Sequence, residues 1–238
     1  MPHRSLNPEK ILSTVRTLRN RVRERFPQAG LVQVADELVA ITEEAQELNE
    51  RLRRRASWMR GLIIFSVLAI LVAGFFAAKQ LQFAGRELNW TEFAQGIEAS
   101  INDIVLVGAA LFFLFTLDSR FERRAVLQKL HELRSIAHVV DMHQLTKDPE
   151  RVNPAHNPTP SSPKYTLEPH ELTRYLDYCS EMLSLIGKLA ALHGKDSSDS
   201  VVLNAVDEVE SLSTGISRKI WQKIMIILTT QDAATRVG

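Results

Sequence analysis

The stretch GLIIFSVLAILVAGFFAA, residues 61–78, decides the fold because it carries no charged side chain over 18 residues. An α-helix rises about 1.5 Å per residue, so this stretch is about 27 Å long, close to the roughly 30 Å of a bilayer core. Trp58 precedes it at interface depth. About 60 residues come before it, whereas the apolar region of a cleavable signal peptide is shorter and lies near the start of a chain. We therefore predict a transmembrane helix over about 60–79.

A second apolar run, IVLVGAALFFLFTL at residues 104–117, is uncharged but only 14 residues long. A run of that length is also typical of a buried core helix. Extending it back to Ala99 gives 19 residues and includes Asn102 and Asp103. Spanning is favoured because a chain that has crossed once needs a return path, and because three arginines follow the run. We predict the second span over about 99–117.

Basic side chains flank one end of each predicted span. Eight arginines lie near the proposed inner ends: Arg51, Arg53, Arg54, Arg55, Arg60, Arg120, Arg123 and Arg124. The stretch 79–100 holds only Lys79 and Arg86 as basic residues, against three glutamates. The positive-inside rule then places both termini in the cytoplasm and the connection 80–98 outside. We expect an integral protein of a bacterial inner or plasma membrane, with a helix starting near Trp90 because Asn89 and Glu92 have capping-box spacing.

The N-terminal residues 1–56 are predicted to form two cytoplasmic helices. Asn7 and Pro8 suit the start of a basic helix over 8–25. Its arginines could contact anionic lipid. Alternatively, they form a solvated face balanced by nearby acids, and we favour this second interpretation. A second helix over 31–56 repeats apolar residues at alternating spacings of three and four, as in a heptad pattern: Leu31, Val34, Leu38, Ile41, Ala45, Leu48 and Leu52.

The second span is expected to continue inward as a helix over 120–146. Its apolar residues repeat at the same spacing: Val126, Leu130, Leu133, Ala137 and Val140. The two extensions would run antiparallel, and each apolar stripe could cover the other or a neighbouring chain. Residues 147–164 contain five prolines, so we predict a linker without helix there.

Residues 165–238 are predicted to form a helical hairpin that docks on the inner bundle. One helix runs from about Glu168 to His193 and a second follows. The expected stripe of the last helix is Val202, Val206, Val209, Leu212, Ile216, Ile220, Ile224 and Ile227. The basic and apolar run 217–230 could lie on the membrane surface, but we favour a core stripe.

The fold class is therefore all-α: a two-span transmembrane hairpin extended into a cytoplasmic antiparallel coiled coil or helical bundle. Glycine is low at 10 residues, and no run of alternating β-branched residues bounded by turns is present. Close packing of helices in lipid is favoured by small residues, which cluster in both spans: Ala69, Ala73, Gly74, Ala77, Gly108, Ala109 and Ala110.

Composition and motifs argue against several functions. With 29 basic and 28 acidic residues, the chain lacks the basic excess that nucleic acid binding needs. One cysteine, Cys179, permits neither an internal disulfide nor a Cys-based zinc site, and we expect it to be a small buried apolar residue. His131, His138 and His143 lack the four-residue spacing of a zinc helix. With no phosphate-binding loop or nucleophile elbow, we expect no catalytic residues, no metal, no cofactor and no enzyme.

Two polar groups are candidate sites. Asp103, beside Asn102, would be costly within the first turns of a span unless it is paired or hydrated. It could form an ion site or an acidic ring at the outer mouth of a pore. Alternatively, it lies at headgroup level, caps the helix, or pairs with Lys79 or Arg86. The second group is Arg134, His138 and Asp141, which lie within two turns and could form a polar network.

These features leave two functions open. The first is a non-enzymatic, homo-oligomeric membrane scaffold whose cytoplasmic helices hold a protein partner. The second is an oligomeric ion channel, or membrane-permeabilising effector, whose second span lines the pore. The two-span layout with inner helices resembles that of predicted pore-forming effectors in bacterial defence systems, which is a likeness of architecture. We favour the scaffold, because one pair of spans cannot enclose a pore and a channel requires several chains.

Overall fold

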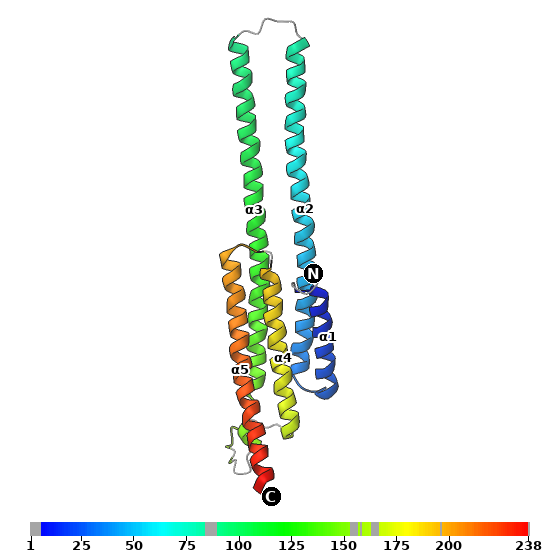
Figure 1. Ribbon diagram of the computed structural model, residues 1–238, viewed down its shortest axis with the longest axis vertical. Coiled ribbons are helices and arrows are strands. Elements are labelled where there is room, and N and C mark those ends of the chain that lie inside the picture. The colour runs from blue at the N-terminus through cyan, green and yellow to red at the C-terminus, as the bar shows by residue number, and fades with distance from the viewer. Residues whose placement is uncertain are drawn as a thin grey trace. The chain divides into compact units, whose positions relative to one another are not determined.

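A computed structural model describes residues 6–83, 90–152, 157, 159–162, 167–195 and 197–237 (Figure 1). These residues form helices and no strand, which confirms the all-α class. The elements are α1 (Pro8–Arg25), α2 (Leu31–Phe83), α3 (Trp90–Leu145), the 3-10 helix η1 (Pro149–Val152), α4 (Pro169–Gly194) and α5 (Ser200–Val237).

The chain divides into two compact units. The bundle unit comprises Met1–Glu47 and Ala125–Gly238, and the apolar unit comprises Leu48–Arg124. Helices α2 and α3 each contribute residues to both units, and each unit is described by itself.

Helix α1 confirms the basic helix expected over residues 8–25. The side-chain oxygen of Asn7 accepts hydrogen bonds from the backbone N–H groups of Glu9 and Lys10, at 2.9 and 3.2 Å, which satisfies donors that the first turn leaves unpaired. Its arginines form ion pairs with acids on α2 and α4, so its basic face is balanced within the bundle unit. These pairs are Arg16–Glu43, Arg19–Asp36, Arg23–Asp36 and Arg21–Glu181.

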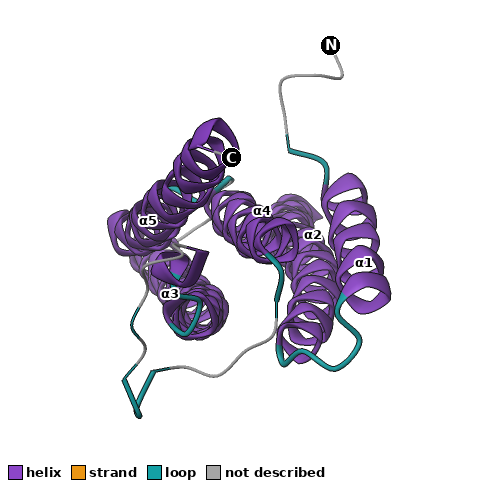
Figure 2. Ribbon diagram, turned by 90° about the horizontal axis from the view of Figure 1, so that it is seen from below, coloured by secondary structure: helices purple, strands orange, loops and turns teal. Residues whose placement is uncertain are grey.

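Helix α4 is the central helix of the bundle unit. Fourteen of its 26 residues are buried, more than one amphipathic face can supply. Figure 2 shows α4 flanked by α5 and α3 on one side and by α2 and α1 on the other. The apolar stripe of α2 from Leu31 to Ala45 is buried, and so is the stripe of α3 from Val126 to Val140. Both stripes are therefore covered inside the bundle unit.

One detail of the C-terminal region differs from the sequence prediction. The buried stripe of α5 passes through Ser213, whereas Leu212 is only half-buried. The reason is that the spacing steps by four from Val209 and then by three to Ile216, and the polar serine hid this register. Ile220, Ile224 and Ile227 are buried in the core, as favoured, but their neighbours Trp221, Met225 and Leu228 are exposed.

The prediction that no helix occurs in the linker is wrong for one turn. Proline has a fixed φ that suits the first position of a helix, and Pro149 begins η1. The side chain of Asp148 accepts a hydrogen bond from the backbone N–H of Glu150 at 3.0 Å and so supports the turn. The linker residues 153–156, 158, 163 and 164 lie outside the described residues.

The apolar unit contains parts of two helices that are long and apolar enough to cross a membrane. In α2 the segment is Ser57–Phe76, and the second segment belongs to the continuous α3. In the most apolar window of each segment, 0% of the residues are buried. Helix α3 begins at Trp90 as expected, while Arg86, Glu87 and Asn89 of the connection lie outside the described residues.

The central position of α4 predicts a large cost for a cavity there. Replacing the fully buried Leu183 by Ala should lower the free energy of unfolding by about 2–5 kcal/mol, because contacts are lost and the void is only partly refilled. The matched control is Leu203→Ala on α5, where the side chain is 40% exposed and a change within about 0.5 kcal/mol is expected. Urea unfolding of the detergent-solubilised chain, followed by circular dichroism, measures both. Equal losses would contradict the assigned core.

Candidate functional site

Asn102 and Asp103 are both exposed on α3. Successive residues of a helix point about 100° apart, so the two side chains do not form one site. Among the described residues Asp103 has no ion pair. Of its two expected partners, the Lys79 ammonium lies 5.6 Å from the centroid of the Phe75 ring, and Arg86 lies outside the described residues.

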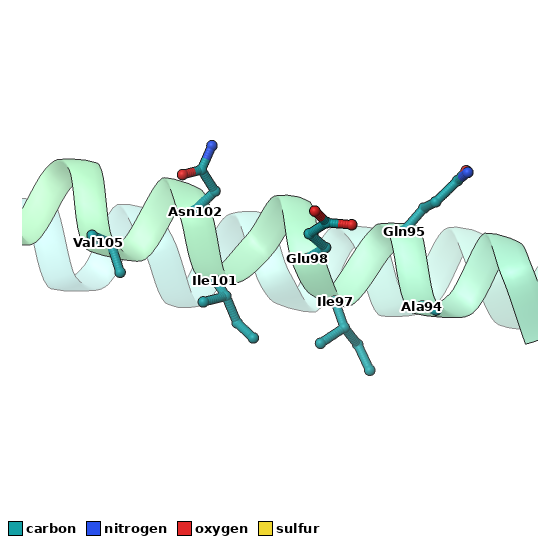
Figure 3. A pocket seen from close by; sticks show the side chains of 7 residues that line it. All are labelled: Ala94, Gln95, Ile97, Glu98, Ile101, Asn102 and Val105. Atoms are coloured by element: carbon teal, nitrogen blue, oxygen red, sulfur yellow. The ribbon is translucent and has the colours of Figure 1, made fainter.

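The structure instead groups Asn102 with two residues that the sequence analysis missed. Gln95, Glu98 and Asn102 are separated by three and four residues, and Figure 3 shows their side chains on one side of α3, with Ile97 and Ile101 pointing away from them. We call these three residues the polar stripe. Together with neighbouring apolar side chains of α3, they line a shallow surface hollow. The three-and-four spacing was the signal that could have identified the stripe.

The polar stripe has no partner within the described part of the chain. None of its three side chains forms a hydrogen bond or an ion pair there. The apolar side chains around it are also exposed, as shown by Ile97 at 45% and Ile101 at 57%. This surface is therefore open to solvent, lipid or another chain.

The glycines of the apolar segments do not serve as close packing positions within the chain. A Cβ atom built on Gly74 or on Gly108 meets no other atom within 4 Å. Small residues allow helices in lipid to approach closely, but no helix of the described chain approaches these two glycines. They therefore remain available to a helix from another molecule.

Arg134, His138 and Asp141 are not joined to one another by hydrogen bonds in the described structure. The Arg134 guanidinium donates to Glu208 on α5, with Nη1 and Oε2 2.9 Å apart. Asp141 accepts a hydrogen bond from the side chain of Gln144 at 2.6 Å, and His138 is exposed. Arg134 therefore links α3 to α5, and Asp141 stabilises the last turn of α3.

A buried histidine faces charged groups where α2, α3 and α4 meet. His193 on α4 is 6% exposed, and both of its ring nitrogens lack hydrogen-bond partners in the described structure. Burial, and secondarily the positive charge of Lys129, lower its pKa to about 4. Lys129 binds Glu44 on α2 and Glu132 on its own helix at 2.5 and 2.7 Å. Although burial opposes its charge, these hydrogen bonds raise the pKa of Lys129.

Aromatic and basic side chains lie close together at the C-terminal end of α3. The Tyr175 hydroxyl lies 3.4 Å from Nδ1 of His143, and the Lys147 ammonium lies 4.8 Å from the centroid of the Tyr175 ring. Cys179 is fully buried nearby, and burial raises the pKa of its thiol to about 12. A thiol becomes a good nucleophile only as the thiolate, so this cysteine is an inert core residue.

The described residues form no group of three or more histidine, cysteine, aspartate or glutamate side chains that could hold a metal ion. The ion pairs of the bundle unit mainly join helices, and the polar stripe of the apolar unit has no such partner among the described residues. Comparison of the chain with family models, with curated proteins and with solved structures finds no match.

His193 should make the bundle unit sensitive to acid. Its pKa is about 4 in the folded chain and about 6.5 when unfolded. The unfolded chain therefore binds the proton more tightly, and the contribution of neutral His193 is fully present above about pH 6.5 and is lost as the pH falls towards 4. The loss should approach about 3 kcal/mol. The thermal unfolding midpoint, measured from neutral to acidic pH, tests this expectation.

Two variants separate this effect from the titration of carboxylates. His193→Leu removes the buried ring and should reduce the fall of the midpoint in acid. His138→Leu changes an exposed histidine and should leave the acid dependence as it is. If both variants lose stability in acid as steeply as the natural chain, His193 does not carry the effect.

Proposed function

We propose that this protein is a non-enzymatic, two-pass integral membrane protein that self-associates and acts as a scaffold. The observation that carries this proposal is the contrast between the two units. The bundle unit buries the apolar stripes of α2 and α3 that lie within it, whereas the two apolar segments have 0% of their most apolar windows buried. Apolar surface of that extent is not stable in water. Lipid is the surrounding that would satisfy it, and helices can cross lipid because their backbone groups are paired internally.

The charges near the segments support an orientation with both termini in the cytoplasm. Arginines precede the α2 segment and follow the α3 segment, and the stretch between the two segments is poor in basic residues. The positive-inside rule places the arginine-rich ends on the cytoplasmic side. The bundle unit, which holds both termini, would then lie in the cytoplasm of a cell whose inner or plasma membrane contains the spans.

Self-association is supported by surfaces that the chain leaves open. Gly74 and Gly108 have free space above their Cα atoms, and large apolar side chains such as Phe112 and Phe113 are 73% and 65% exposed. Helices of other copies can use both features. In the bundle unit, charged side chains mainly join helices, which suits a rigid domain that holds a protein partner rather than a catalytic centre or a nucleic acid site.

Membrane insertion and topology test this proposal together. Cys179 is first replaced by Ala, and single cysteines are then introduced as Gln95→Cys and Ser211→Cys, both at exposed positions. In intact spheroplasts, a membrane-impermeant maleimide should label Gln95→Cys, and it should label Ser211→Cys only after lysis. The protein should also stay in the membrane pellet after alkaline carbonate. Release by carbonate would overturn the membrane assignment, and the opposite labelling pattern would overturn the orientation.

The polar stripe supports a second candidate function, an oligomeric ion channel or membrane-permeabilising effector whose α3 helices line the pore. Polar side chains at the end of a membrane span are costly unless they are paired or face water. Gln95, Glu98 and Asn102 lie on one face and have no partner in the described structure. Several copies arranged around a pore would direct this face towards water.

Ion flux through liposomes distinguishes the channel from the scaffold and also identifies the residue involved. If the polar stripe lines a pore, Glu98→Gln should reduce cation selectivity, because it removes one carboxylate per chain from the pore wall. Asp103 lies about 140° round the helix from Glu98, so Asp103→Asn serves as the matched control, with a smaller expected effect. A larger effect from Asp103 would reject the stripe as the pore lining. No flux from folded, inserted protein would favour the scaffold.

A further inference from the structure

Helix α5 carries an apolar stripe that the bundle unit does not cover. Trp221, Met225 and Leu228 are separated by four and three residues, so they share one face, and they are 60%, 42% and 41% exposed. The buried residues Ile220, Ile224 and Ile227 lie on a different face of the same turns. The helix is thus apolar on two faces, and only one of them is used within the chain.

The exposed stripe lies far from the end of the bundle unit at which α2 and α3 leave it. Lys223 of α5 donates hydrogen bonds to the carbonyl oxygens of Gln144 and Lys147, at the C-terminal end of α3. Helix α3 enters the bundle unit at Ala125, which is about 29 Å from Gln144 at 1.5 Å per residue. The stripe is therefore not at the end of the bundle from which the apolar segments continue, and this position argues for a protein surface as its occupant rather than lipid.

Charges at the two ends of the stripe are arranged symmetrically. Arg218 lies seven residues before Met225 and Asp232 lies seven residues after it, and seven residues are two turns of a helix. Both side chains belong to exposed residues, and neither has an ion-pair partner among the described residues. A second α5 that ran antiparallel, with its Met225 opposite this Met225, would place each Arg218 opposite an Asp232. A parallel second helix in the same register would instead place like charges together.

We propose that α5 pairs with α5 of a second copy of this chain, antiparallel and about a two-fold axis near Met225. This interface rests on the proposed self-association and gives it a location in the bundle unit. Trp221 of each chain packs near Leu228 of the other, and two Arg218–Asp232 ion pairs close the ends. Such an interface is isologous, because the same patch is used on both copies. The apolar stripe supplies the attraction, and the exposed charges fix direction and register.

Cysteine cross-linking in membranes tests the two-fold axis. A residue on such an axis meets its own copy, and two cysteines can form a disulfide only when their Cα atoms are within about 7 Å. Met225→Cys in the full chain should therefore give an oxidised dimer in high yield. Ile226→Cys is the matched control, because this neighbour is equally apolar and 45% exposed but points about 100° away. It should give several-fold less dimer. The native Cys179 is fully buried, so we expect it not to cross-link.

Charge exchange tests direction independently of the cross-link geometry. In the Met225→Cys chain, Arg218→Asp or Asp232→Arg alone should lower the dimer yield several-fold, because each places like charges opposite one another. The double variant, Arg218→Asp with Asp232→Arg, should restore the yield. Failure of the double variant to restore it would overturn the antiparallel pairing, because only that arrangement brings these two residues together. All of these changes are at exposed positions, and circular dichroism checks the helix content.

The remaining outcomes separate this interface from self-association in general. Equal dimer yields from Met225→Cys and Ile226→Cys would show random collision and overturn the pairing. A cross-linked product whose mass is not twice that of the chain would identify another protein as the occupant and overturn it as well. If neither cysteine cross-links while native mass spectrometry still shows an oligomer, the α5 interface falls and the scaffold proposal stands. If cross-linking and native mass spectrometry both show only a monomer, the α5 interface and the proposed self-association are both overturned.

Discussion

The apolar side chains of α2 and α3 impose the constraint on which the rest of the structure depends, because no other part of the described chain buries them. A segment in a non-aqueous surrounding must also pair its own backbone N–H and C=O groups. A helix does this without help from its neighbours, so both segments lie within uninterrupted helices of 53 and 56 residues. The remaining helices form the bundle unit together with the N-terminal part of α2, up to Glu47, and the C-terminal part of α3, from Ala125.

That domain is organised around α4 rather than around the pair α2 and α3. Each long helix presents one buried apolar stripe to the bundle unit. Over half of the residues of α4 are buried, and Figure 2 shows this helix between α2 and α3. Ion pairs then connect the outer helices, as Arg16 connects α1 to Glu43 of α2 and Arg134 connects α3 to Glu208 of α5. Exposed pairs of this kind contribute little stability individually, so burial of the apolar stripes is the main force that holds the bundle unit together.

Local signals predicted the helices well, and tertiary partners were not predictable from them. Asn7 and Pro8 predicted the start of α1, because capping acts within a few residues. Apolar periodicity predicted the buried stripes of α2 and α3. Periodicity does not say which stripe meets which, so the central place of α4 and the Arg134–Glu208 pair, 74 residues apart, could not be derived. The polar stripe was not predicted, because the charge of Asp103 within a span is conspicuous, whereas Gln95 and Glu98 are identified only by their spacing from Asn102. The polar Ser213 and His193 broke the apolar pattern while occupying core positions.

The burial of the single cysteine has a consequence for how this molecule responds to its chemical surroundings. Burial raises the pKa of the Cys179 thiol to about 12, so the thiol stays protonated at neutral pH, and the fully buried sulfur is out of reach of oxidants and of other thiols. Cys179 therefore cannot take part in disulfide exchange while the chain is folded. The protein should keep the same fold in reducing and oxidising compartments, and changes in cellular redox balance should not alter its structure.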